Sequence, residues 1–109
     1  GVRVREDCEK ALQEADIVYM LRIQQERQQG GLFPSLREYA GLYGLNKKRL
    51  QLLHKDAFVL HPGPVNIGVE MTGPVMDHPR VLIQKQVENG VYVRMAILDM
   101  LIQGGCENE

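Results

Sequence analysis

Two short segments of the chain carry groups that could bind a charged ligand. The first follows an apolar run at residues 17–21 and reads Arg22-Ile23-Gln24-Gln25-Glu26-Arg27. The planar fork of an arginine binds a carboxylate through two hydrogen bonds, and the Gln24 amide can add one donor. The segment therefore allows an acidic small-molecule ligand. The alternative is a solvated loop in which Arg22 and Arg27 pair with nearby acids.

The second segment is a bend, His61-Pro62-Gly63-Pro64, which follows the apolar residues 57–60. Proline has no N–H and a fixed φ, so this backbone cannot continue a hydrogen-bonded ladder. The carbonyl oxygens of Pro62 and Gly63 could instead accept hydrogen bonds from an –NH2 group. His61 has two interpretations: a general acid or base near neutral pH, or a satisfied side chain that orients the loop.

The other reactive side chains give no clear site. We expect His54 and His78 to be solvated, and the three histidines lack metal-ligand spacing. Cys8 and Cys106 lie far apart without a C-x-x-C motif, which suggests neither a zinc site nor a disulfide framework. The sequence also contains no nucleophile elbow and no glycine-rich phosphate loop. It therefore predicts neither a metal nor a cofactor.

The composition is that of one ordinary globular domain. Of 109 residues, 44% are hydrophobic and 25% are charged, which excludes disordered and collagen-like chains. A net charge of −1 gives no electrostatic reason to expect nucleic acid or a membrane surface as a partner. We expect a cytoplasmic protein. Because the chain opens on Gly1 rather than methionine, we also expect it to be a piece of a longer protein.

Alternating strand and helix patterns predict an α/β domain with three layers, a Rossmann-like parallel sheet with helices on both faces. Ser35 and Glu38 form a capping-box pattern at the start of a helix that Gly44 ends, and Asn46 can cap the next helix. The expected strands span 2–4, 17–21 and 57–60, the remaining helices 6–15 and 80–104, and an ordered loop 61–79. The carboxyl ends of parallel strands meet at one edge, so the two segments should lie together there.

Four stretches, in order, resemble the aspartate-binding domain of the bacterial aspartate carbamoyltransferases. They are ADIVYMLRIQQER, FPSLREYAGLYGL, HPGPVNIGVE and QVENGVYVRMAIL, and the resemblance covers nearly all of residues 2–104. It implies that residues 1–109 are part of that domain, in the C-terminal part of the aspartate/ornithine carbamoyltransferase fold. The helix at 80–104 would then pack back on a carbamoyl-phosphate domain that this chain lacks, which would explain Gly90 inside it.

The resemblance also implies substrates and roles. The family transfers a carbamoyl group from carbamoyl phosphate to the amine of L-aspartate in pyrimidine biosynthesis, without metal or cofactor. Family members form homotrimers with shared active sites, and regulatory or pathway-enzyme subunits are further partners to consider. Because the phosphate-binding half is absent, we expect the chain alone to be inactive. The implied roles are aspartate binding by Arg22 and Gln24, carbamoyl binding by Pro62, Gly63 and Pro64, and support by Glu26, Arg27 and His61.

Ile67 departs from the family pattern, which has arginine at this place in HPGPxNRGVE. The loss of a guanidinium could weaken loop closure or the charge balance around an acidic ligand. Alternatively, a nearby basic residue could substitute for it, or the arginine could only brace the loop. Two other functions remain open. One is an ornithine carbamoyltransferase, although the bend there reads H-C-L-P and Pro62 stands here in place of its cysteine. The other is a non-catalytic carbamoyltransferase-like module that supports assembly with other subunits.

Overall fold

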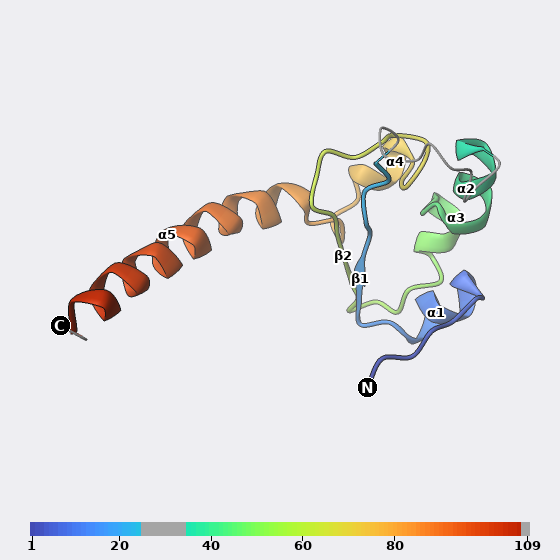
Figure 1. Ribbon diagram of the computed structural model, residues 1–109. Coiled ribbons are helices and arrows are strands. Elements are labelled where there is room, and N and C mark those ends of the chain that lie inside the picture. The colour runs from blue at the N-terminus through green and yellow to red at the C-terminus, as the bar shows by residue number, and fades with distance from the viewer. Residues whose placement is uncertain (25–34, 108–109) are drawn as a thin grey trace.

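A computed structural model describes residues 1–24 and 35–107 of the chain. Figure 1 shows the shorter helices on one side of two short strands, with one long helix that extends away on the other side. The elements in chain order are α1 (Cys8–Glu14), β1 (Ile17–Tyr19), α2 (Leu36–Tyr43), α3 (Lys47–Leu50), β2 (Phe58–Leu60), α4 (Gly73–Met76) and α5 (Ile83–Glu107). None of the described helices is long and apolar enough to cross a membrane.

The two strands are parallel, as the sequence predicts. Val18 pairs with Val59 in the register of β1 and β2, and the Met20 N–H extends the ladder by donating to the Leu60 carbonyl oxygen at 2.8 Å. On its other edge β2 is bridged in parallel by Val81, just before α5. The α/β class with parallel strands is therefore confirmed, and β1 and β2 end at the same edge.

One face of this sheet carries the core. Val59 is fully buried there, against apolar side chains from α1, α3 and the α4 region. The core consists of Leu12, Leu45, Leu50, Leu53, Ala57, Val59, Met71 and Val75. On the other face Ile17 is 60% exposed and Phe58 is 47% exposed, and the described residues place only the beginning of α5 near it. This alternation follows from the pleat of a strand, which sends successive side chains to opposite faces.

Local capping chemistry sets the helix starts that the sequence predicts. The Ser35 hydroxyl oxygen accepts from the Glu38 N–H at 3.1 Å, and the Asn46 side-chain oxygen accepts from the Arg49 N–H at 2.9 Å. Each bond satisfies a backbone donor in the first turn that has no partner within the helix. Gly44 ends α2, and its N–H donates to the Ala40 carbonyl oxygen. These predictions are confirmed.

The predicted strand at residues 2–4 is wrong. Val2 is 95% exposed, and residues 1–5 have no regular structure. The alternation of Val2-Arg3-Val4 suits a strand, but a strand also needs a neighbour that offers ladder hydrogen bonds. Among the described residues none pairs with this segment.

The predicted loop at 61–79 is more structured than expected. It contains α4, which has Pro74 in its first turn, and bridges that join Met71 to Leu45 and to Ile67. The last helix begins at Ile83 instead of residue 80 and continues past residue 104. A Cβ built on Gly90 would meet nothing within 4 Å, so no described backbone approaches it. Its packing against a further domain stays a prediction.

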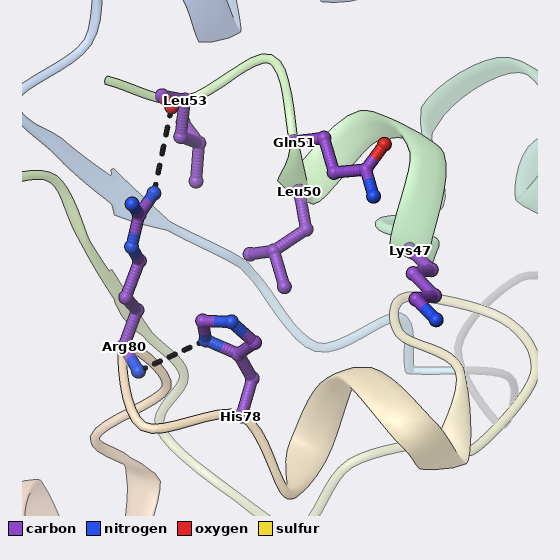
Figure 2. Close-up of a pocket in the computed structure, with 6 residues that line it drawn as sticks. All are labelled: Lys47, Leu50, Gln51, Leu53, His78 and Arg80. Carbon is purple, nitrogen blue, oxygen red and sulfur yellow. Dashed lines mark hydrogen bonds between the residues drawn. The ribbon is translucent and has the colours of Figure 1, made fainter. Parts of the chain in front are cut away.

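Arg80 ties the segment before α5 to the turn after α3. Its Nη1 donates to the carbonyl oxygens of His54 at 3.1 Å and Leu53 at 3.4 Å, beside a hollow of about 270 Å³ (Figure 2). The His78 ring nitrogen Nδ1 accepts from the Arg80 backbone N–H at 3.2 Å. Lys47 also lines this hollow. The hydrogen bonds of Arg80 to the carbonyl oxygens of Leu53 and His54 account for the position of its side chain in the hollow.

Candidate functional site

The segment after β1 alternates between exposed and buried side chains. Arg22 and Gln24 are exposed, whereas Ile23 between them is buried. The carbonyl oxygen of Ile23 accepts a hydrogen bond from the Asn66 side-chain amide at 2.9 Å. Asn66 lies just beyond the bend, so this bond joins the two strand-end segments, as the sheet geometry predicts. Glu26 and Arg27 lie outside the described residues.

The bend after β2 exposes Pro62 and Pro64 and leaves Gly63 half-buried. Gly63 has a φ of +66°, in the left-handed region that glycine adopts readily, and a cis peptide bond joins it to Pro64. Its N–H is already used, because it donates to Nδ1 of His61 at 2.8 Å. Since the two prolines have no N–H, the bend offers carbonyl oxygens and no free backbone donor from residues 62 to 64.

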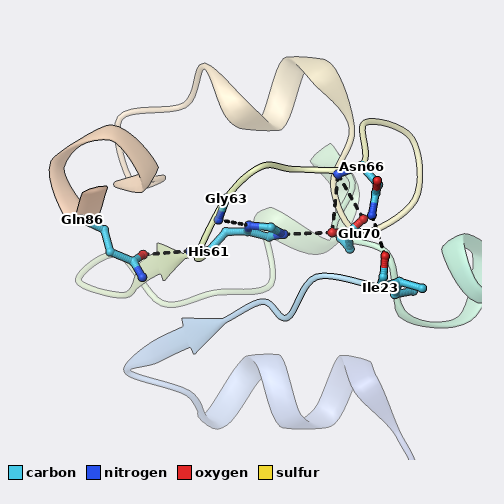
Figure 3. A network of polar contacts seen from close by, with 6 residues as sticks. All are labelled: Ile23, His61, Gly63, Asn66, Glu70 and Gln86. Carbon is cyan, nitrogen blue, oxygen red and sulfur yellow. Dashed lines mark hydrogen bonds and ion pairs between the residues drawn. The ribbon is translucent and has the colours of Figure 1, made fainter. Parts of the chain in front are cut away.

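The hydrogen bonds of His61 define its tautomer. Nδ1 accepts from the Gly63 N–H, so it carries no proton, and Nε2 donates its proton to Oε1 of Glu70 at 3.0 Å (Figure 3). The His61 side chain is fully buried and both ring nitrogens are engaged. A second proton on Nδ1 would face the Gly63 N–H. This geometry favours the orienting interpretation of His61 over the role of general acid or base.

Glu70 is a buried carboxylate that sequence reasoning missed. It is fully buried, and it accepts from the Asn66 backbone N–H at 3.2 Å as well as from His61. Acceptance from N–H donors at both oxygens is the bonding of an ionised carboxyl group. A signal existed, since Glu70 stands between Val69 and Met71 in an otherwise apolar stretch.

Gln86, in the first turns of α5, was also missed. Its side-chain oxygen accepts from the His61 backbone N–H at 3.0 Å, and its –NH2 group donates to the Tyr19 hydroxyl at 2.9 Å. It therefore connects the ends of both strands to the long helix. No sequence pattern marks this contact, because Gln86 is 25 residues from His61 and 67 from Tyr19.

The remaining predicted positions lie elsewhere or make other contacts. Ile67 is 67% exposed, on a tight loop in which the Gly68 N–H donates to the Met71 carbonyl oxygen at 2.8 Å. His54 is more than solvated, because its Nε2 lies 2.9 Å from a carboxylate oxygen of Asp16. His78 is exposed, as expected.

The charge of Glu70 affects the pKa of a tyrosine, Tyr39. Burial raises the pKa of Tyr39, and the negative charge of Glu70 raises it further.

Within residues 1–24 and 35–107, no group of three or more histidine, cysteine or acidic side chains is arranged to hold a metal ion. At the carboxyl edge of the sheet, the exposed side chains of Arg22 and Gln24 follow β1 and the bend follows β2, with the hydrogen bond from Asn66 to Ile23 between the two segments.

The model of one protein family matches residues 1–101, and its description is "Aspartate/ornithine carbamoyltransferase, Asp/Orn binding domain". The chain belongs to this family. The match covers almost the whole sequence, including both strand-end segments.

Relatives in the carbamoyltransferase family are much longer than this chain. It is 55% identical over 106 residues to the aspartate carbamoyltransferase catalytic subunit of Pelotomaculum thermopropionicum, covering 97% of this chain and 34% of that protein. It is 58% identical over 104 residues to the same subunit of Desulforamulus reducens, covering 95% and 33%. The chain thus spans about a third of the length of these relatives.

Solved structures of carbamoyltransferases share the fold. Aspartate transcarbamoylase from Trypanosoma cruzi, in complex with aspartate and phosphate, matches with a TM-score of 0.66 at 27% identity, over 89% of this chain and 27% of that one. Ornithine carbamoyltransferase from Burkholderia thailandensis matches with a TM-score of 0.73 over 91% of this chain and 30% of that one. At 21% identity, the second match shows the fold alone.

Proposed function

We propose that this chain forms the part of an aspartate carbamoyltransferase that binds L-aspartate and holds the carbamoyl group. The observation that carries the proposal is the hydrogen bond from Asn66 to the Ile23 carbonyl oxygen. It brings a segment suited to a carboxylate against a bend suited to an –NH2 group. The relatives at 55% and 58% identity, named as aspartate carbamoyltransferase catalytic subunits, support this choice of reaction.

Aspartate binds through the segment after β1. The Arg22 guanidinium takes a carboxylate of aspartate in the bidentate geometry that its planar fork favours, and Gln24 adds a donor beside it. Both side chains are exposed at the carboxyl edge of the sheet, where a ligand can reach them.

The carbamoyl group binds at the bend. Its –NH2 donates to the carbonyl oxygens of Pro62 and Gly63, and Pro64 fixes the direction of the backbone. The aspartate amine then attacks the carbamoyl carbon and forms a C–N bond, while the C–O bond to phosphate breaks. The departing phosphate takes up the proton that the amine loses, and N-carbamoyl-L-aspartate and phosphate are released. The contribution of these residues is position and orientation, which alone can supply about 7–11 kcal/mol of a barrier.

The groups that bind phosphate come from outside this chain, so the chain alone is inactive. The complete protein is a cytoplasmic homotrimer with active sites shared between subunits, and it acts in pyrimidine biosynthesis. The exposed apolar side chains of α5, from Val91 to Ile102, support contact with a further domain.

A chimera tests this function. This chain replaces the matched third of the catalytic subunit from Pelotomaculum thermopropionicum, and carbamoyl transfer is measured with aspartate and with ornithine as acceptors. We expect transfer to aspartate and none to ornithine. Transfer to ornithine instead would select the ornithine enzyme. A folded chimera that transfers to neither would favour the non-catalytic assembly module.

A further inference from the structure

The two halves of the proposed site are joined through one buried carboxylate. His61, whose Nδ1 holds the Gly63 N–H, donates from Nε2 to Glu70 at 3.0 Å. Glu70 accepts the backbone N–H of Asn66 at 3.2 Å, and the Asn66 side chain reaches the Ile23 carbonyl oxygen at 2.9 Å. Figure 3 shows this continuous series of contacts from the bend to the segment after β1.

The position of Glu70 is itself well defined. Its carbonyl oxygen accepts from the Leu45 N–H at 2.8 Å, which fixes the backbone of the loop against the end of α2. Its side chain is fully buried, so water cannot replace a donor that moves away. An ionised carboxylate in such a place must keep its hydrogen-bond donors, because an unpaired buried charge is strongly unfavourable. The Glu70 carboxylate therefore keeps His61 and Asn66 within hydrogen-bond distance.

The two residues that donate to Glu70, His61 and Asn66, each also contact one half of the proposed site. His61 accepts the hydrogen bond of Gly63 in the bend, and Asn66 donates to Ile23, which lies between Arg22 and Gln24. We propose that Glu70 is a positioning residue for both substrates, acting through His61 on the carbamoyl site and through Asn66 on the aspartate site. This inference rests on the proposed function.

Three substitutions in the active chimera separate the two branches. Glu70→Ala removes both contacts, so KM should rise for carbamoyl phosphate and for aspartate, each by at least about tenfold. Asn66→Ala removes the contact to Ile23 and should raise KM for aspartate alone. Glu70→Gln keeps one oxygen for His61 and turns an –NH2 group toward the Asn66 N–H, so it should resemble Asn66→Ala. Glu6→Ala, which removes an exposed carboxylate before α1, is the matched control.

A merely structural role for Glu70 predicts a different pattern. It would lower the yield and melting temperature of the Glu70→Ala protein, while the folded fraction kept both KM values within about twofold of the parent. That result would overturn the proposal, as would a Glu70→Gln protein that behaves like Glu70→Ala, because the branches would then not be separable.

A spectroscopic measurement distinguishes failure of this inference from failure of the proposed function. Nitrogen-15 NMR of His61 in the parent chimera should show a neutral ring with the proton on Nε2, and Glu70→Ala should change that signal. An inactive chimera with this signature would refute the carbamoyltransferase assignment and leave the contact of Glu70 with His61 intact. A charged ring, or a proton on Nδ1, would overturn the positioning role whatever the activity.

Discussion

Gly44 lies where the end of α2 passes close to the loop that carries Glu70. A Cβ built on Gly44 would stand 2.6 Å from the carbonyl oxygens of Ala40 and Val69, whereas ordinary contacts begin at 3.4 Å. Both oxygens belong to the backbone, so a side-chain rotation cannot relieve the overlap. Gly44→Ala should therefore force the loop away from α2, at a cost of about 3 kcal/mol, as for an overpacked core.

Gly41, one turn earlier, provides the matched control. It lies inside α2, and a Cβ there would meet nothing within 4 Å. Gly41→Ala should stabilise the protein by up to about 1 kcal/mol, because alanine is the better helix former. The same chemical change should thus have opposite effects inside α2 and just after its last residue.

The measurement is differential scanning calorimetry of the chimera and its two variants. The chimera is about three times as long as this chain, so the melting temperature should fall by about 5 °C for Gly44→Ala and rise by up to about 2 °C for Gly41→Ala. Because Val69 precedes Glu70, Gly44→Ala should also raise KM for both substrates. A Gly44→Ala protein that melts at or above the parent temperature would refute the close approach of the two backbones.

Three further predictions follow from the described contacts. Arg22→Ala should raise KM for aspartate by at least about tenfold and leave that for carbamoyl phosphate unchanged in steady-state assays, since the proposed site uses this guanidinium for aspartate alone; equal rises in both KM values would contradict its role. The pKa of Tyr39 is higher in the folded state than its usual value of 10, so the neutral phenol contributes stability that is fully present below pH 10. This contribution is lost as the pH rises through the higher pKa of the folded state. Tyr39→Phe should therefore flatten the fall in stability above pH 10 and remove a late step from the absorbance titration of tyrosinate; an unchanged late step would assign it to another tyrosine. Arg80→Met should lower the free energy of unfolding by about 1–3 kcal/mol, measured by urea unfolding, because it removes a donor from two carbonyl oxygens; Lys85→Met, at an exposed position, is its control and should have little effect.

Local chemistry was the most predictable part of the fold. Ser35 and Asn46 cap helices because their side-chain oxygens reach donors three residues away, within one turn. The strand expected at residues 2–4 is wrong for the opposite reason, since a strand needs a partner that is distant in the sequence. In α4, Pro74 suggested a loop, but proline is also compatible with the first turn of a helix.

In the candidate site, too, some contacts could be predicted from the sequence and others could not. Parallel strands end at one edge, so the meeting of the segment after β1 with the bend followed from element order, and the bond from Asn66 to Ile23 agrees with it. The residues that hold the bend could not be found by that argument. Glu70 and Gln86 contact His61 from 9 and 25 residues away, and no periodicity encodes such contacts.

The length of α5 has a mechanical consequence. Its described polar contacts with the strand ends come from Gln86, and residues 91–103 are all exposed. From Gln86 to Glu107 the helix rises by about 32 Å, so a rotation of about 5° at Gln86 would displace its far end by about 3 Å. The point of rotation is thus Gln86, whose side chain contacts His61 and Tyr19. A small adjustment of the bend around a ligand would be amplified at the far end of α5, without any change in the helix itself.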